Sequence, residues 1–253
     1  MNVYKKLAVA SLISVASMAA SASTINVGGV TWDPDYNDPT PPPAADLIMK
    51  YSFDQWFVDA ADAGTYDPFA AIDPFSVTDG DELQGSGRVT EFNGLLDPAL
   101  GGTGFCLSCE LTFEFGGLLA DGAGGFHTGG FFKFYVETGA DIDGDYTEGA
   151  GPLWLELAVD NVSFSSGGPV GGLYTSGHVD VEFSAVGGMA MANFDTDSVN
   201  GSDIAYAADA LFDGLYANGT GDAKGNTVPE PSTLAVLGLG LLGLMASRRK
   251  KIS

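Results

Sequence analysis

Four stretches of the chain alternate hydrophobic and polar residues with a period of two, which is the pattern of strands that bury one face. They lie at residues 110–115, 131–136, 153–160 and 179–184, and further candidates lie at 46–58, 86–92, 188–195 and 203–212. Glycine pairs and Gly-Asp dipeptides separate these stretches, as expected for turns. The pattern predicts a mainly β fold: a single antiparallel domain of the β-sandwich or jelly-roll-like type over residues 47–222.

The segments on either side of this domain differ in composition. Residues 33–46 are rich in proline and aspartate, which favours a loop or a semi-rigid linker. We therefore assign residues 23–46 to an N-terminal segment that precedes the β-rich domain. Residues 223–253 form a C-terminal tail, which contains a short motif at 228–231, an apolar run and a basic end.

Charge is unevenly distributed along the 253 residues. The stretch 23–228 holds 32 acidic and four basic residues, a net charge of −28, and the other basic residues lie near the two ends. A body this acidic repels polyanions, which excludes nucleic-acid binding as a leading function. The same field attracts divalent cations and keeps copies of the body apart.

The N-terminus, residues 1–22, has the features of a signal peptide. Two lysines form a positive region, and an apolar run follows over residues 7–20. Ala20 and Ala22 form a small-x-small cleavage site, so signal peptidase is expected to release a chain that begins at Ser23. The alternative is an uncleaved anchor helix, for which the run is short. The body then belongs in an oxidising compartment outside the cytoplasm.

The C-terminus ends in an apolar run and a basic cluster. Residues 232–247 are expected to form a single hydrophobic helix, and the uncharged stretch 234–246 makes it a marginal membrane span. Four cations that should remain on the cytoplasmic side follow it: Arg248, Arg249, Lys250 and Lys251. A helix that is apolar on every face and closes with such a cluster is unlike a helix of a globular core.

A short proline-rich motif precedes this helix. Pro229, Glu230 and Pro231 stand in the segment 228–231, and the two prolines favour extended backbone that cannot join the helix. A Pro-Glu-Pro motif, an apolar helix and a terminal basic cluster, in that order, resemble the sorting tail of PEP-CTERM proteins.

The resemblance implies a route of export. PEP-CTERM proteins are exported by Gram-negative bacteria that make extracellular polysaccharide. Their motif is the signal for exosortase, a membrane-embedded enzyme that resembles cysteine peptidases. The resemblance thus implies that Pro229, Glu230 and Pro231 are the sorting signal. It also implies an intermediate held transiently in the inner membrane, followed by release to the cell surface or the medium.

Cys106 and Cys109 are the only two cysteines. In an exported chain the default is a disulfide. It requires a tight turn at 106–109, because an extended strand would hold the two α-carbons about 10 Å apart. A metal or redox role and a pair of free thiols are the alternatives, and only His127 and His178 could help to complete a zinc site.

Asp141, Asp143 and Asp145 alternate in the densest acidic loop of the chain. Alternating carboxylates on a loop that contains glycine resemble the start of a calcium loop, although Gly144 comes two residues early for an EF-hand. The loop is either a calcium site or a solvated acidic turn. A second acidic loop, at residues 195–201, leaves the same two alternatives.

The sequence singles out no catalytic residues. Glycosidases use a pair of carboxylates, but among 32 carboxylates a suitable pair arises by chance. The Gly-x-Ser-x-Gly motif of serine hydrolases is absent from the sequence. Six aromatic residues could stack on sugars or fill the core: Trp32, Trp56, Tyr66, Phe131, Tyr135 and Trp154. We expect a protein that is not an enzyme and that holds no cofactor other than calcium.

Together these features predict an exported, exosortase-processed protein of the cell surface or extracellular matrix. Its expected role is structural or adhesive, with extracellular polysaccharide as a candidate partner and no nucleic acid. Two alternatives stay open. The body is a calcium-assisted carbohydrate-binding module, or it is the ectodomain of a permanently tail-anchored protein.

Overall fold

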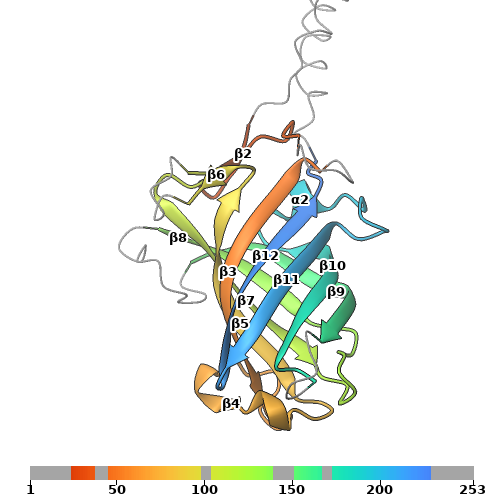
Figure 1. The fold of residues 1–253 in the computed structure, drawn as a ribbon. Coiled ribbons are helices and arrows are strands. Elements are labelled where there is room, and N and C mark those ends of the chain that lie inside the picture. The colour runs from red at the N-terminus through yellow and green to blue at the C-terminus, as the bar shows by residue number, and fades with distance from the viewer. Residues whose placement is uncertain (1–23, 38–44, 98–103, 139–150, 167–172, 229–253) are drawn as a thin grey trace, which may run out of the picture. The chain divides into compact units, whose positions relative to one another are not determined.

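The computed structural model describes residues 24–37, 45–97, 104–138, 151–166 and 173–228. Within them, eight long antiparallel strands form one sheet that closes into a barrel (Figure 1). Each of these strands pairs with its neighbours in the chain, and β3 pairs with both β5 and β12, which completes the ring. In chain order they are β3 (Leu47–Val58), β5 (Glu82–Phe92), β7 (Cys109–Leu119), β8 (Phe131–Thr138), β9 (Leu153–Ser166), β10 (Ser176–Gly187), β11 (Ile204–Asp213) and β12 (Tyr216–Gly225).

The prediction of a mainly β, antiparallel fold is confirmed, whereas a closed barrel replaces the expected sandwich or jelly roll. The four alternating stretches lie inside β7, β8, β9 and β10. Period-two patterning determines which face of a sheet each residue occupies, but it does not determine whether the sheet closes. Closure depends on the pairing of β3 with β12, which are far apart in the sequence.

The predicted strand at 188–195 is wrong. β10 ends at Gly187, and Gly188 has a φ of +90°, a left-handed conformation that glycine adopts without strain. The chain then turns into the short helix α2 (Met191–Phe194), whose Phe194 is fully buried. The apolar residues of this stretch therefore cover one end of the barrel instead of extending the sheet.

Residues 24–228 form one compact unit. At its start, β1 (Ile25–Val27) and β2 (Val30–Trp32) form a hairpin. The Trp32 ring packs at 5.7 Å from Phe92, 5.9 Å from Trp154 and 5.6 Å from Phe194, measured between centroids. The hairpin and α2 together close this end of the barrel, which we call the plug end.

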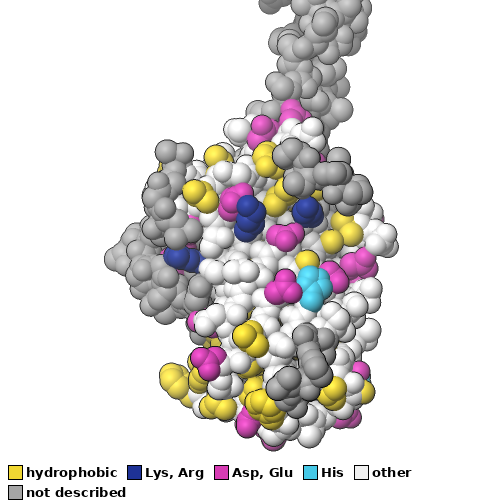
Figure 2. Space-filling model, in the orientation of Figure 1, with side chains coloured by type: hydrophobic (Ala, Val, Ile, Leu, Met, Phe, Trp, Pro, Cys, Tyr) yellow, Lys and Arg dark blue, Asp and Glu magenta, His cyan; other side chains and the backbone are white. Residues whose placement is uncertain are grey.

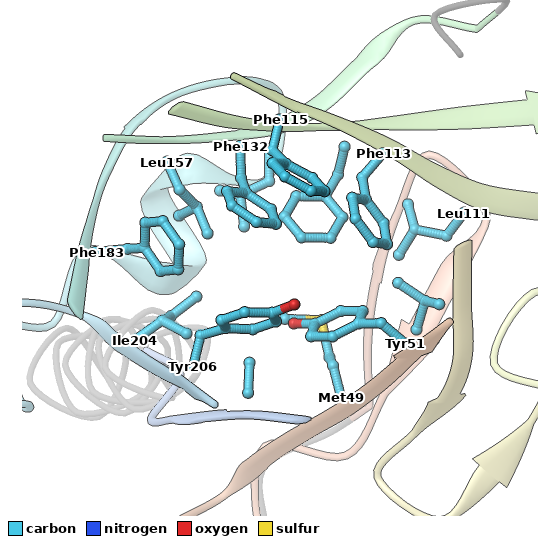
Figure 3. Close-up of a cluster of buried hydrophobic side chains, with 14 of the residues drawn as sticks. Met49, Tyr51, Leu111, Phe113, Phe115, Phe132, Leu157, Phe183, Ile204 and Tyr206 are labelled. Carbon is cyan, nitrogen blue, oxygen red and sulfur yellow. The ribbon is translucent and has the colours of Figure 1, made fainter. Parts of the chain in front are cut away.

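The barrel interior is packed with aromatic side chains (Figure 3). Phe115 of β7 and Phe132 of β8 stack with their centroids 4.7 Å apart, and Tyr51 and Tyr206 face them from the opposite wall. β12 carries only small residues at the positions that face these rings: Ala217, Gly219, Gly221, Ala223 and Gly225. The rings need this space, so the interior is a packed core and not an open channel.

The opposite end of the barrel, which we call the distal end, is formed by the connection from β3 to β5. This connection contains two single-turn 3₁₀ helices, η1 (Pro68–Ala70) and η2 (Pro74–Ser76), on either side of β4 (Ala71–Ile72). β4 pairs with Phe57 and Val58 at the end of β3. A further short strand, β6 (Leu95–Leu96), follows β5 at the plug end.

Among the described residues, no helix has the length and hydrophobicity that a membrane span requires. The predicted hydrophobic helix at 232–247 lies outside the described residues.

Candidate functional site

Several predicted site residues lie outside the described residues, and nothing in the structure tests them. These are the signal-peptide cleavage residues Ala20, Ala22 and Ser23, the acidic loop residues Asp141, Asp143 and Asp145, the motif residues Pro229, Glu230 and Pro231, and the basic residues Arg248, Arg249, Lys250 and Lys251. The chain is described up to Val228, directly before the motif.

The two cysteines lie together at disulfide distance. Cys106 and Cys109 have their α-carbons 5.1 Å apart and are joined as a disulfide. Residues 105–108 form the tight turn that the spacing requires, and β7 begins at Cys109. Both cysteines are buried at the plug end, where the O atom of Phe105 accepts a 2.7 Å hydrogen bond from the N–H of Thr31. The disulfide therefore fixes the turn at 105–108, and the β1–β2 hairpin is hydrogen-bonded to this turn.

The second acidic loop brings three aspartates together. Asp195, Asp197 and Asp203 each place a carboxylate oxygen within 4.8 Å of the others. Asp203 is buried, and its carboxylate accepts hydrogen bonds of 2.6 to 2.7 Å from the N–H groups of Ala185, Thr196 and Asp197. These three bonds satisfy the buried carboxylate. They give the loop a structural explanation that needs no cation.

Three of the six aromatic residues that could either stack on sugars or fill the core are core residues. Trp32, Trp56 and Trp154 are 2% exposed or less. Trp154 donates its Nε1–H to the O atom of Val27, so its polar edge is used inside the plug end. A stacking surface cannot be built from these three side chains.

Exposed aromatic residues are found instead at the distal end, on a motif that the alternation pattern does not detect. Residues 67–69 and 73–75 both read Asp-Pro-Phe. Phe69 is 94% exposed and Phe75 is 64% exposed. Figure 2 shows hydrophobic side chains gathered at this end of the molecule. The tandem repeat is the sequence signal that could have located this surface.

Each Asp-Pro-Phe turn is built in the same way. The carboxylate of Asp67 accepts a 2.8 Å hydrogen bond from the N–H of Phe69, and that of Asp73 accepts one of 3.0 Å from the N–H of Phe75. Proline occupies the first helical position in both turns, where its fixed φ suits a helix start. The phenylalanines are therefore presented on capped turns rather than on loose loops.

Strand residues support the first of these turns. Tyr216 donates its hydroxyl to the O atom of Pro68 at 2.9 Å, and its ring contacts Trp56 at 6.3 Å between centroids. Trp56 in turn packs edge-to-face on Tyr66 at 5.3 Å. We call Phe69, Phe75 and Tyr216 the distal aromatic tip.

Behind the tip, the end of the barrel core contains a small apolar cavity of about 40 Å³. Phe57, Phe126, Phe164 and Phe212 are among its aromatic lining residues. Tyr174 fastens the 121–125 turn over it by accepting from the N–H of Gly124 and donating toward Asp121. Burial raises the pKa of the Tyr174 hydroxyl, which keeps this donor protonated.

A histidine lies between two carboxylates on the outer face of the sheet. His178 on β10 contacts Asp209 through Nδ1 at 3.0 Å and Asp180 through Nε2 at 3.3 Å. The hydrogen bond with Asp209 is the main cause that raises the pKa of His178 above its usual value. Both ring nitrogens contact carboxylates at the surface of the sheet, and the protonated ring forms ion pairs with them.

The comparisons identify the tail and leave the body unmatched. A family model described as the PEP-CTERM protein-sorting motif matches residues 227–250. Comparison with curated proteins found no match, and comparison with solved structures also found none. The matched segment begins at Thr227, whose N–H donates to Asp46 at the plug end, two residues after β12 ends. The chain therefore carries a PEP-CTERM sorting motif, the mark of an exported surface protein that is targeted to exosortase.

Proposed function

We propose that this protein is a structural or adhesive component of the cell surface or extracellular matrix, and that it acts without enzymatic chemistry. The observation that carries the proposal is the sorting motif at 227–250, placed directly after the last strand of the barrel. Because the motif follows the last strand, the complete barrel is exported and sorted as one unit.

The proposed route has three steps. Signal peptidase cuts after Ala22. The tail then holds the barrel outside the inner membrane, with the four cations at 248–251 on the cytoplasmic side. Exosortase finally recognises Pro229, Glu230 and Pro231 and removes the helix. Because β12 ends at Gly225, a cut beside the motif leaves every strand of the barrel intact.

Three features of the body support a role outside the cell. Within the part of the chain that the structure describes, the closed sheet leaves no long strand edge unpaired, which protects a surface protein from edge-to-edge aggregation. The disulfide at Cys106 and Cys109 suits an oxidising compartment. The excess of carboxylates keeps neighbouring copies apart and in solution.

The test is the intact mass of the protein recovered from its host, measured in the membrane and extracellular fractions. We expect an extracellular species that begins at Ser23 and ends near Pro229. The matched variant is Glu230→Gln. It removes one charge from the motif, should not be cut, and should therefore keep its full tail in the membrane fraction. A wild-type chain with an uncut tail confined to the membrane would contradict processing and identify a permanently anchored ectodomain.

A further inference from the structure

We propose that the distal aromatic tip binds a cationic amino-sugar polymer. The inference rests on the proposed extracellular role, because it requires that the barrel meet such a polymer outside the cell. It is carried by four properties of the tip: presentation of the rings, charge, shape and position.

The rings are held ready for a ligand before it arrives. Phe69 and Phe75 project from capped turns, and Tyr216 is fixed by its bond to the O atom of Pro68. Binding therefore immobilises little additional backbone, which removes a major cost of association. Phe69 and Phe75 are exposed to 94% and 64%, and the same kind of capped Asp-Pro-Phe turn presents each of them.

The charge around the rings selects the sign of the partner. The connection 59–81, which carries both phenylalanines, contains six aspartates and neither lysine nor arginine, although Asp81 is buried and Asp79 contacts His127. An anionic polymer or an anionic membrane would be repelled by this segment. An ammonium group is attracted by the carboxylates and also by the faces of the aromatic rings, since cations bind aromatic faces.

The shape of the tip favours a sugar over a peptide. The tip provides no pocket of its own for a peptide side chain, because the Phe69 ring is 94% exposed and has no walls around it. A flat C–H face of a sugar needs only one aromatic face on which to stack. The Asp-Pro-Phe unit occurs twice, with a spacing of six residues, so a polymer of repeated units can engage both copies at once.

The position of the tip leaves it accessible. Thr227 and Val228 bond to Asp46 and Asn193 at the plug end, and the tip occupies the opposite end of the barrel. A barrel that is tethered through the segment after Val228 can therefore turn the tip away from its attachment point. This geometry disfavours the anchoring membrane as the partner.

The experiment measures binding of oligosaccharides, by calorimetry, to the protein purified from its host, with its tail cut or intact. The probes are oligomers of glucosamine, oligomers of N-acetylglucosamine and oligomers of the anionic sugar guluronate. We expect glucosamine oligomers to bind most tightly, with an affinity that falls as salt rises, and guluronate oligomers not to bind. Phe69→Ala with Phe75→Ala should weaken glucosamine binding about tenfold, the value for losing two stacked cation–π contacts.

The matched control is Leu107→Ala, which removes an apolar side chain that is 79% exposed at the other end of the barrel and should bind like wild type. A second variant, Asp62→Asn with Asp213→Asn, should flatten the salt dependence while the rings stay in place; Asp213 is the exposed last residue of β11 and pairs with Tyr216 of the tip. All variants alter exposed residues, and their folding is checked by thermal melts.

Three results would overturn the proposal. The double phenylalanine variant binds as well as wild type, oligolysine of equal charge competes as well as the sugar, or vesicles of zwitterionic lipid capture the wild type but not the double variant. The second result identifies a general anionic patch and the third a lipid-binding tip. Because binding is measured on purified protein, it is independent of whether exosortase cuts the tail, and the two proposals fail separately.

Discussion

The ring of Phe53 on β3 lies directly against the α-carbon of Gly219, its paired residue on β12. A methyl group at Gly219 would overlap the ring, so the pairing that closes the barrel depends on the absence of a side chain there. The same arrangement recurs where Phe113 and Phe115 face Gly87 and Gly85 on β5. Large rings on one strand are thus accommodated by glycines on the next.

This relationship predicts the effect of a single methyl group. Gly219→Ala should lower the free energy of unfolding by about 2 kcal/mol, because the ring of Phe53 must move within a packed core. Urea unfolding followed by tryptophan fluorescence measures the change. Thr220→Ala, one residue later on the exposed face, is the control and should change stability by no more than about 0.5 kcal/mol. Equal stability of the two variants would show that the core is looser than described.

The buried carboxylate of Asp203 is expected to stabilise the loop after α2. Asp203→Ala leaves three backbone N–H groups without their acceptor and should cost about 3 kcal/mol. Asp203→Asn retains one acceptor oxygen and should cost less. Asp195→Asn, at an exposed member of the same cluster, is the control. If millimolar calcium raised the melting temperature of wild type but not of Asp195→Asn, the loop would be a cation site instead.

The disulfide should contribute modestly because it closes a short loop. For the four residues from Cys106 to Cys109, chain entropy gives about 2 kcal/mol. Reduction should therefore lower the melting temperature of wild type without unfolding it at room temperature. The variant with serine at both positions should not respond to the reductant. A wild-type melt that ignores the reductant would mean that the thiols are free.

The surface pair of His178 and Asp209 predicts a pH dependence with a definite sign. The pKa of His178 is raised in the folded state, so its contribution to stability is fully present below the unfolded value of 6.5 and is lost as the pH rises through the folded value. Asp209→Asn should lower the pKa of His178, measured by NMR titration of its ring protons. His178→Gln should remove this component from the pH dependence of the melting temperature. An unchanged titration in Asp209→Asn would mean that the contact does not persist in solution.

The sequence predicted the strands well and their assembly poorly. Alternation places Leu111, Phe113 and Phe115 on one buried face because local sterics and burial act over a few residues. Barrel closure follows from a contact between β3 and β12 that no local pattern encodes. The alternation also fails on β12 itself, where the buried face consists of glycine and alanine and carries no hydrophobic signal.

Some parts of the candidate site could likewise be predicted from the sequence, and others could not. The disulfide between Cys106 and Cys109 could be predicted because it is the default for two cysteines of an exported chain, and the tail because its three signals occur in a fixed order. The distal aromatic tip was missed because composition and periodicity treat Phe69 and Phe75 as ordinary apolar residues. Only the structure reveals that both are exposed, although the repeated Asp-Pro-Phe would have pointed to them.

The pairing of the first and last barrel strands has a consequence for timing. A chain that crosses a membrane from its N-terminus presents β3 early, and β3 must wait for β12 before the ring can close. Residue 227, where the sorting segment starts, emerges two residues after that strand is complete. The motif therefore follows the last barrel strand almost at once along the chain, and an exosortase that recognised it would meet a chain whose strands are all complete.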